Sequence, residues 1–216
     1  MAKLELELQV PVYDPAALDA VVAQKGWAER NWPYWLEDWP ASLRLIEVLE
    51  KEARAGISGP VLDLGCGAGL LTRYFASRFT QTFACDINEE ACRLTRFNLP
   101  DSSLAKGNAA VVCADLNHIP FRIRFGLVAV GELLYDHALA GQVLAFLGLA
   151  LADQGMALLA DAGRFTADDL PNRALQAGFE IHRLEKSSAE RHRVFALTRP
   201  GRELHFPLSE AWTRCR

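Results

Sequence analysis

Residues 61–75 read VLDLGCGAGLLTRYF, and this stretch decides the fold. A short apolar run, Val61 to Leu64, predicts a buried strand, and the residues after the glycines have the periodicity of an amphipathic helix. Glycines let the main chain turn with positive φ and bring its N–H groups close to a ligand. The stretch therefore predicts a nucleotide-binding loop between a strand and a helix. A glycine-rich turn without a ligand is the alternative.

The spacing of the glycines separates two classes of cofactor. Gly65, Gly67 and Gly69 are spaced as GxGxG, and Leu70 stands where a dinucleotide-binding GxGxxG loop has its third glycine. Asp63 precedes the loop, and a carboxylate suits a cationic amino-acid group better than a diphosphate. We interpret the loop, with Cys66 inside it, as a site for S-adenosylmethionine. Asp63 would face the methionine end, directly or through water.

Two more acidic residues follow predicted strands. Asp86 closes the strand TQTFACD about 20 residues after the glycines, where a carboxylate accepts hydrogen bonds from ribose hydroxyls. This position indicates adenosine without separating NAD from S-adenosylmethionine, and Ile87 beside it belongs to the same predicted site. Asp115 closes AAVVCAD and is a candidate acceptor for the adenine amino group, with Leu116 next to it. A helix cap or solvated turn is the alternative for Asp115.

Strands and helices alternate after Pro60, which predicts a Rossmann-like, doubly wound α/β fold with a mostly parallel sheet. The seven strands are expected at 60–64, 82–86, 109–114, 126–131, 155–161, 179–185 and 193–199, and the helices at 69–77, 88–97, 137–150 and 166–177. The last two strands lie too close together for a helical crossover and should be antiparallel. Residues 59–216 form the predicted core. Residues 1–58 form an N-terminal segment with a strand at 4–10 and helices at 14–25 and 41–55, all within one compact domain.

Composition excludes several classes of protein. The 216 residues carry a net charge of −4, which lacks the basic footprint of a nucleic-acid-binding protein. The start MAKLELELQV has no basic region followed by an apolar run, and the apolar run around 144–152 is short for a membrane span. We expect a cytoplasmic protein that binds neither nucleic acid nor membrane. The five cysteines form no CxxC pair and the histidines no i, i+4 pair, so we expect buried free thiols, solvated or capping histidines, and no metal site.

Three segments resemble one group of methyltransferases. The expected open sheet with a terminal antiparallel pair resembles that of class I, seven-strand methyltransferases. The residues ELLY at 132–135 resemble the (D/E)xxY motif of the seven-strand protein lysine methyltransferases. NWPYWLEDWPASLRLIEVL, at 31–49, resembles their aromatic entry helix. ADAGR, at 160–164, resembles the GDPGR segment of the electron-transfer-flavoprotein β-subunit lysine methyltransferase branch.

The resemblance assigns roles to four residues. Trp39 would line the cofactor pocket, together with Gly131 at the end of the fourth strand. Glu132 and Tyr135 would border the channel through which a substrate nitrogen approaches. Core packing is the alternative for Trp39. The chain departs from the branch by having Glu132 where Asp is commoner and Ala162 where the second motif has proline.

These observations predict an S-adenosylmethionine-dependent methyltransferase that releases S-adenosylhomocysteine. The resemblance favours a protein side-chain nitrogen, lysine, as the acceptor. A small-molecule amine or hydroxyl is the second reading, since one fold hosts many acceptors. A non-catalytic interaction protein is the third. Asp161 and Arg164 are expected to shape the substrate mouth or to pair with each other.

Overall fold

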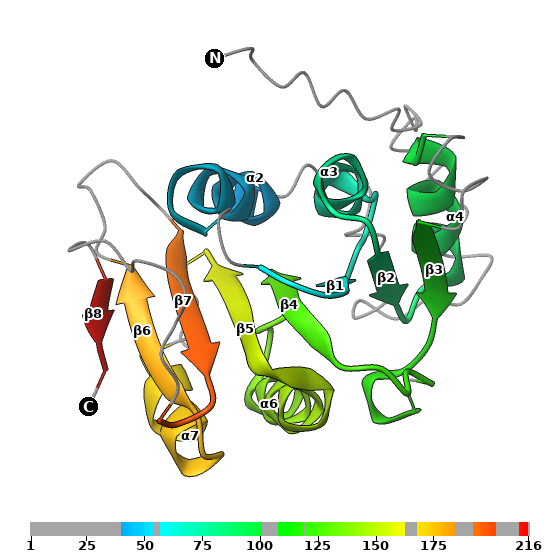
Figure 1. The fold of residues 1–216 in the computed structure, drawn as a ribbon. Helices are drawn as coiled ribbons and strands as arrows, with labels where there is room; N and C mark the ends of the chain where they lie inside the picture. The colour runs from blue at the N-terminus through cyan, green and yellow to red at the C-terminus, as the bar shows by residue number, and fades with distance from the viewer. Residues whose placement is uncertain are drawn as a thin grey trace.

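The computed structural model describes residues 40–53, 57–100, 108–118, 120–162, 168–184, 192–201 and 212–215. The strand and helix expected at 4–10 and 14–25, as well as Trp39 and Arg164, lie outside these residues. Within them the chain forms one sheet with the order β3-β2-β1-β4-β5-β7-β6-β8 (Figure 1). Its strands are β1 (Val61–Leu64), β2 (Thr82–Asp86), β3 (Ala109–Cys113), β4 (Phe125–Gly131), β5 (Leu151–Asp161), β6 (Glu180–Leu184), β7 (Arg193–Thr198) and β8 (Trp212–Arg214).

The sheet has a parallel part and an antiparallel part. Strands β3, β2, β1, β4 and β5 pair in parallel, with Leu64 opposite both Cys85 and Val130. Strand β7 is antiparallel to β5, and β6 pairs antiparallel with both β7 and β8. The predicted parallel sheet with a terminal antiparallel pair is therefore confirmed.

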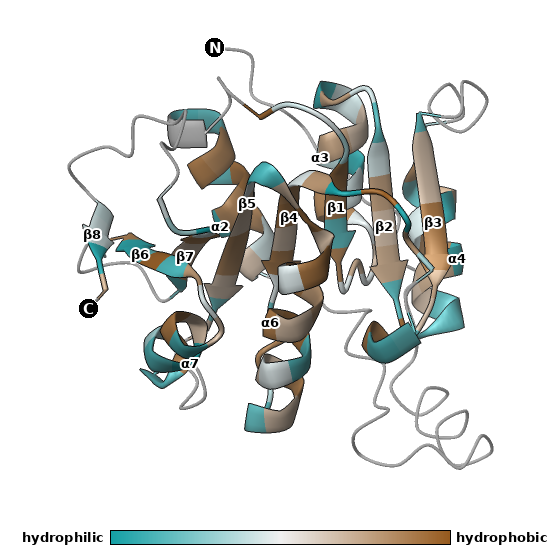
Figure 2. Ribbon diagram, turned by 60° about the horizontal axis from the view of Figure 1, so that its bottom comes forward, coloured by the Kyte–Doolittle hydropathy of each residue, from teal (hydrophilic) through white to brown (hydrophobic). Residues whose placement is uncertain are grey.

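Helices cover both faces of this sheet. They are α2 (Pro40–Val48), continued by the π-helical turn η3 (Leu49–Ala53), then α3 (Leu70–Arg78), α4 (Glu89–Asn98), the short 3₁₀ turn η4 (Leu116–His118), α6 (His137–Ala150) and α7 (Leu170–Gln176). Helices α2, α3 and α4 lie on one face and α6 and α7 on the other (Figure 1). The strands are apolar where helices cover them (Figure 2), and two clusters of buried side chains fill the two sides of the sheet.

Local capping explains where two helices begin. The Asn88 side chain accepts hydrogen bonds from the N–H groups of Glu90 and Ala91 at the start of α4. The Asp136 side chain accepts one from Leu139 at the start of α6. These contacts satisfy N–H groups that have no partner inside the helix. No helix in the described ranges is long and apolar enough to cross a bilayer.

Three boundaries differ from the expected ones, and one strand is additional. Strand β5 begins at Leu151, not at 155, because the polar residues before Gly155 extend the strand through an irregular register with β4. The helix expected at 41–55 changes to a π-helical turn at Leu49. The helix expected at 166–177 begins at Leu170, with Pro171 in its first turn. An eighth strand, β8, adds to the seven expected; three residues are too few to give a periodic signal.

Candidate cofactor and acceptor site

The glycine loop follows β1 at the carboxyl edge of the parallel strands. Gly65, Gly67 and Gly69 have φ of 77°, 51° and 88°, all in the left-handed region that favours glycine. The N–H groups of Gly65 and Cys66 both donate to the carbonyl of Cys85, at 2.7 and 3.1 Å. The predicted turn from strand to helix is confirmed, and β2 holds its start.

Asp63 lies on β1 and is buried. The Thr72 hydroxyl donates to its Oδ2 at 2.6 Å, so the first turns of α3 hold the carboxyl group. Burial raises the pKa of Asp63 to about 7; hydrogen bonds from Thr72 oppose the rise, and the nearby Asp86 charge adds to it. Thr72 was not expected in the site. Its place as a polar residue on the buried side of the helix after the loop is the pattern that could have predicted it.

Asp86 connects the end of β2 to the loop. Its Oδ2 accepts a hydrogen bond from the Gly67 N–H at 3.0 Å, and its Oδ1 accepts one from the Asn88 N–H at 2.9 Å. Burial raises the pKa of Asp86, while main-chain N–H groups of Asn88, Gly67 and Ile87 oppose the rise. A carboxylate has about four lone-pair sites, so these contacts leave capacity for ribose hydroxyls.

Helix α4 supports the loop from behind. The Thr95 hydroxyl donates to the Gly67 carbonyl at 2.8 Å, and the Asn98 amide donates to the Ala68 carbonyl at 2.9 Å. A Cβ on Gly69 would lie 2.9 Å from the Thr95 Cα, which explains the close approach of loop and helix. Sequence analysis missed Thr95 and Asn98, because both lie about 30 residues beyond the loop.

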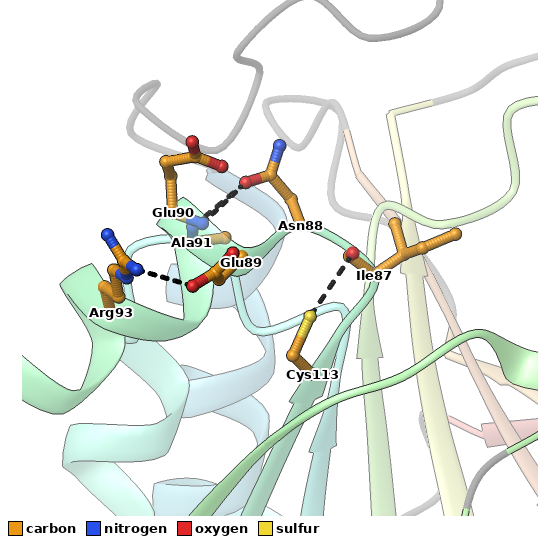
Figure 3. Close-up of polar contacts among 7 residues, drawn as sticks. All are labelled: Ile87, Asn88, Glu89, Glu90, Ala91, Arg93 and Cys113. Carbon is orange, nitrogen blue, oxygen red and sulfur yellow. Dashed lines mark hydrogen bonds and ion pairs between the residues drawn. The ribbon is translucent and has the colours of Figure 1, made fainter.

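Ile87 projects at the outer edge of the site. Its side chain is 71% exposed, unusual for a large apolar residue, and it lies between the end of β2 and the start of α4 (Figure 3). The Cys113 thiol at the end of β3 donates to the Ile87 carbonyl at 3.5 Å. An exposed apolar side chain next to Asp86 fits the face of a purine ring.

Asp115 caps a turn. Its Oδ1 accepts hydrogen bonds from the main-chain N–H of Asn117 at 2.7 Å and from the Asn117 side chain at 2.9 Å. The alternative expected for Asp115, a cap, is thus present, and its contact with adenine stays a prediction. Leu116 begins η4 and lines a pocket of about 270 Å³ between η4 and α6, together with Phe121, Phe146 and Leu149. This pocket meets the predicted site only at Leu116.

The segment after β4 lies beside the loop. A Cβ on Gly65 would come within 2.7 Å of the Leu133 side chain, so Leu133 packs directly against the first glycine. Gly131 is equally close to α2, where a Cβ would lie 2.9 Å from the Ser42 Oγ. Glu132 is buried, whereas Tyr135 is 41% exposed. The predicted channel residues therefore stand at different depths on the segment that contacts the cofactor loop.

Glu132 lies close to a histidine that sequence analysis left among solvated and capping residues. The Nε2 of His192 lies 3.6 Å from the Glu132 Oε1. The next residue, Arg193, pairs with Asp161 at 2.9 Å and also with Asp168. The expectation for His192 was wrong, and the partner found for Asp161 is Arg193. No short motif predicts either contact, because each joins segments that lie far apart in the sequence.

The thiols correct a second expectation. Cys66, Cys85 and Cys92 are buried, but Cys113 is exposed and Cys215 is half-buried. The Cys92 thiol donates to the main-chain carbonyls of Asp86 and Val112, at 3.6 and 3.5 Å. Among the described residues, no group of three or more acidic, cysteine or histidine side chains is arranged to hold a metal ion.

The residues present fit S-adenosylmethionine. Three left-handed glycines form a cradle in which a Cβ on Gly65 or Gly69 would collide with neighbours. The buried carboxyl of Asp63 would be stabilised in its charged form by a cationic amino-acid group. Asp86 has acceptor capacity for a ribose, and Ile87 offers an apolar face for a purine.

Comparison with known proteins places the fold in a class. The methyltransferase domain family matches residues 61–155. The crystal structure of the glycopeptide N-methyltransferase MtfA with sinefungin is similar, with a TM-score of 0.63, 17% identity, and coverage of 88% of this chain and 100% of that one. The N-methyltransferase NodS from Bradyrhizobium japonicum, with S-adenosyl-L-homocysteine, has a TM-score of 0.61 and 17% identity, covering 85% of this chain and 98% of that one. Residues 61–155 therefore match a methyltransferase domain, and the fold of the described residues is shared with these N-methyltransferase structures.

Within that class, one curated relative is similar in sequence. The electron transfer flavoprotein beta subunit lysine methyltransferase of Danio rerio is 30% identical over 142 residues, which are 63% of this chain. The chain spans about half of that relative, 53% of its length. The resemblance drawn from ELLY and ADAGR thus agrees with a match over most of the chain.

Proposed function

We propose that this protein transfers a methyl group from S-adenosylmethionine to a side-chain nitrogen of a protein, a lysine amine. The observation that carries the proposal is a buried carboxylate, Glu132, on the segment whose Leu133 packs against the glycine loop. An acidic group beside the reacting sulfonium is suited to receive a cationic amine. The similarity to a lysine methyltransferase supports the same acceptor class.

Binding of the cofactor would use the loop and three side chains. The loop N–H groups and Asp63 would hold the methionine end, Asp86 the ribose, and Ile87 the purine. When bound, S-adenosylmethionine supplies the activated methyl group and its leaving group. The protein then has to position the amine in line with that methyl group and to exclude water.

The amine must lose a proton before it can attack. A desolvated channel disfavours the ammonium form, and a carboxylate within hydrogen-bond reach can accept the proton. Glu132 is placed for this role, and Tyr135, at the exposed end of the same segment, would guide the incoming side chain. The neutral amine would then be held with its lone pair toward the methyl group that the bound cofactor supplies.

A small-molecule amine is the second candidate acceptor. The similar structures include the glycopeptide N-methyltransferase MtfA and the N-methyltransferase NodS, and their fold is shared with this chain. One fold serves acceptors of very different size. The third candidate is a methyltransferase-like interaction protein without catalytic activity. The intact glycine loop and Asp86 argue against it.

Labelling with radioactive cofactor separates these readings. Purified protein is incubated with S-adenosylmethionine labelled in its methyl group and with a cell extract or purified electron transfer flavoprotein beta subunit. We expect a discrete labelled protein band, and methyl-lysine after acid hydrolysis of that band. Label only in the small-molecule fraction would refute the protein acceptor. Titration calorimetry without detectable binding of the cofactor would refute the enzyme.

A further inference from the structure

Glu132 is held in a strained conformation. Its φ is 54°, the one left-handed φ of a non-glycine residue in the described ranges. Such strain persists only where the surroundings fix it. The Glu132 N–H donates to the Ala160 carbonyl at 3.1 Å, which ties this residue to β5. The fold therefore maintains a strained backbone at Glu132 and keeps its carboxylate at one place beside the cofactor loop.

His192, the residue before β7, reaches the same carboxylate. Strand β5 lies between β4 and β7, with Ala160 opposite Gly131 on one side and Asp161 opposite Arg193 on the other. His192 directly precedes Arg193, so it stands at the same edge of the sheet as Glu132. The 3.6 Å between His192 Nε2 and Glu132 Oε1 spans the end of β5.

The two side chains differ in their access to solvent. The Glu132 side chain is 3% exposed and the His192 side chain is 15% exposed. A proton accepted by Glu132 therefore has little direct contact with water, whereas the imidazole has more. Imidazole can also gain and lose a proton near neutral pH, as few side chains can.

We infer that His192 is a positioning residue that acts through Glu132, taking the proton that Glu132 receives from the acceptor amine and releasing it to water. The inference rests on the proposed function. In the first step the ammonium gives one proton to Glu132 and becomes a neutral amine. Glu132 then passes the proton to the imidazole, which returns to its neutral form by losing it to solvent. Methyl transfer leaves a cationic methylammonium and a neutral thioether, so charge is conserved.

The distance between the pair is compatible with this relay. It is slightly longer than a hydrogen bond, and hydrogen bonds of catalytic groups often tighten only when substrate binds. Arg193 stabilises the base of the His192 segment through its ion pairs with Asp161 and Asp168.

His192→Gln tests the relay, because glutamine keeps polar atoms at similar reach but cannot carry a proton. We expect kcat to fall by roughly 10- to 100-fold with KM for S-adenosylmethionine nearly unchanged. His182→Gln on β6 is the matched control and should keep wild-type kcat. Circular dichroism and thermal unfolding verify that each variant is folded.

Chemical rescue separates the relay from a structural role. In His192→Ala, added imidazole should restore a large part of kcat, because a free imidazole can occupy the space and accept the proton. The same addition should not restore Glu132→Gln, which lacks the first acceptor. An unchanged kcat in His192→Gln, or a loss in His192→Ala that imidazole does not reverse, would overturn the inference.

The outcome also distinguishes the two proposals. Any acceptor that the wild-type protein labels in extract serves as the substrate, so wild-type labelling with equal labelling by His192→Gln refutes the relay alone. No labelling by wild type refutes the proposed function, and the relay with it. In ¹⁵N-labelled protein, the His192 ring nitrogen signal should move in Glu132→Gln; an unmoved signal refutes the contact whatever the activity.

Discussion

Two halves of this site are stabilised in different ways. The cofactor half is the glycine loop with Asp63 and Asp86, and the acceptor half is Glu132 and Tyr135 with their neighbours. Around the glycine loop, the polar contacts all lie in the stretch from β1 to α4: Thr72 binds Asp63, Asp86 binds Gly67, and α4 supports the loop from behind. At the ends of β4, β5 and β7 the contacts join distant segments. Arg193 pairs with Asp161 32 residues away, and His192 approaches Glu132.

The difference shows which half depends on the complete sheet. The polar contacts that hold the loop come from β1, β2, α3 and α4, which form one contiguous stretch of chain. The acceptor half needs β7 to enter the sheet beside β5 from the C-terminal part of the chain. A change that loosens β7 should therefore affect the acceptor side first and leave cofactor binding largely intact.

Removing the guanidinium of Arg193 should have the largest effect. Arg193→Met leaves the fully buried Asp161 without this partner, and breaking a buried pair costs about 3–5 kcal/mol. Urea denaturation measures the loss in the free energy of unfolding. Arg214→Met, which removes an exposed pair with Glu180, is the control and should cost less than about 1 kcal/mol. Equal losses in both variants would remove the contrast between the halves.

Asp86→Asn should weaken cofactor binding without comparable loss of stability. The amide puts a donor where the Gly67 or Asn88 N–H needs an acceptor, and it weakens the bond to ribose. A hydrogen bond to a charged group is worth about 1.5–3 kcal/mol, so Kd should rise about 10- to 150-fold in calorimetry. Glu89→Gln removes only an exposed pair with Arg93 and should bind normally. An unchanged Kd for Asp86→Asn would place the ribose elsewhere.

Asp63 should make stability depend on pH in the cofactor half. Its pKa is about 7 in the folded protein against an ordinary value of 3.8, so the folded state keeps a proton that the unfolded chain has lost between these values. The free energy of unfolding should then fall as pH rises from about 4 to about 7, with a slope of about 1.4 kcal/mol per pH unit from this group. Above pH 7 its contribution is constant.

Asp63→Asn isolates that slope. Asparagine still accepts the Thr72 hydroxyl but does not titrate, so urea denaturation without cofactor should give a flatter curve between pH 5 and pH 7. The remaining slope reports Asp86, whose pKa burial also raises. Parallel curves for wild type and variant would show that Asp63 is charged in the folded protein.

The smallest effect concerns the thiols, and stability should not change. Iodoacetamide should modify Cys113 before the buried Cys66, Cys85 and Cys92. Burial, with the neighbouring Cys92, raises the pKa of the Cys113 thiol, so it should react more slowly than free cysteine. Peptide mass spectrometry follows each site, and Cys113→Ser should remove the first modification. Early labelling of Cys66 would mean that the loop opens.

Sequence patterns predicted the cofactor half well because its signals are local. The short apolar runs, the glycine spacing and the carboxylates at strand ends fixed β1 to β3 within a residue and placed Asp63 and Asp86 in one region. The contact of Asp86 with the Gly67 N–H was beyond reach, since it depends on how far β2 extends past the loop. Asp115 shows another limit of sequence patterns: a carboxylate after a strand fits both a turn cap and a cofactor ligand, and the pattern does not separate the two.

The contacts of the acceptor half were not predicted, because the order of the strands in the sheet decides which residues meet there. Nothing in the residues around His192 tells that β7 lies between β5 and β6, yet this order alone brings the imidazole to Glu132. The eighth strand escaped for a related reason: Trp212 to Arg214 is ordered by its pairing with β6 and not by its own periodicity. The motif ELLY located Glu132 but not its environment.

The double engagement of Asp86 limits how this protein can be redesigned. One carboxylate both fastens the glycine turn and faces the place proposed for the sugar. Replacing Asp86 to admit an altered nucleoside would also remove the hydrogen bond that holds the glycine turn in place. Cofactor engineering would have to begin at Ile87 or Asp115, where a new side chain can be introduced without removing the hydrogen bond between Asp86 and Gly67.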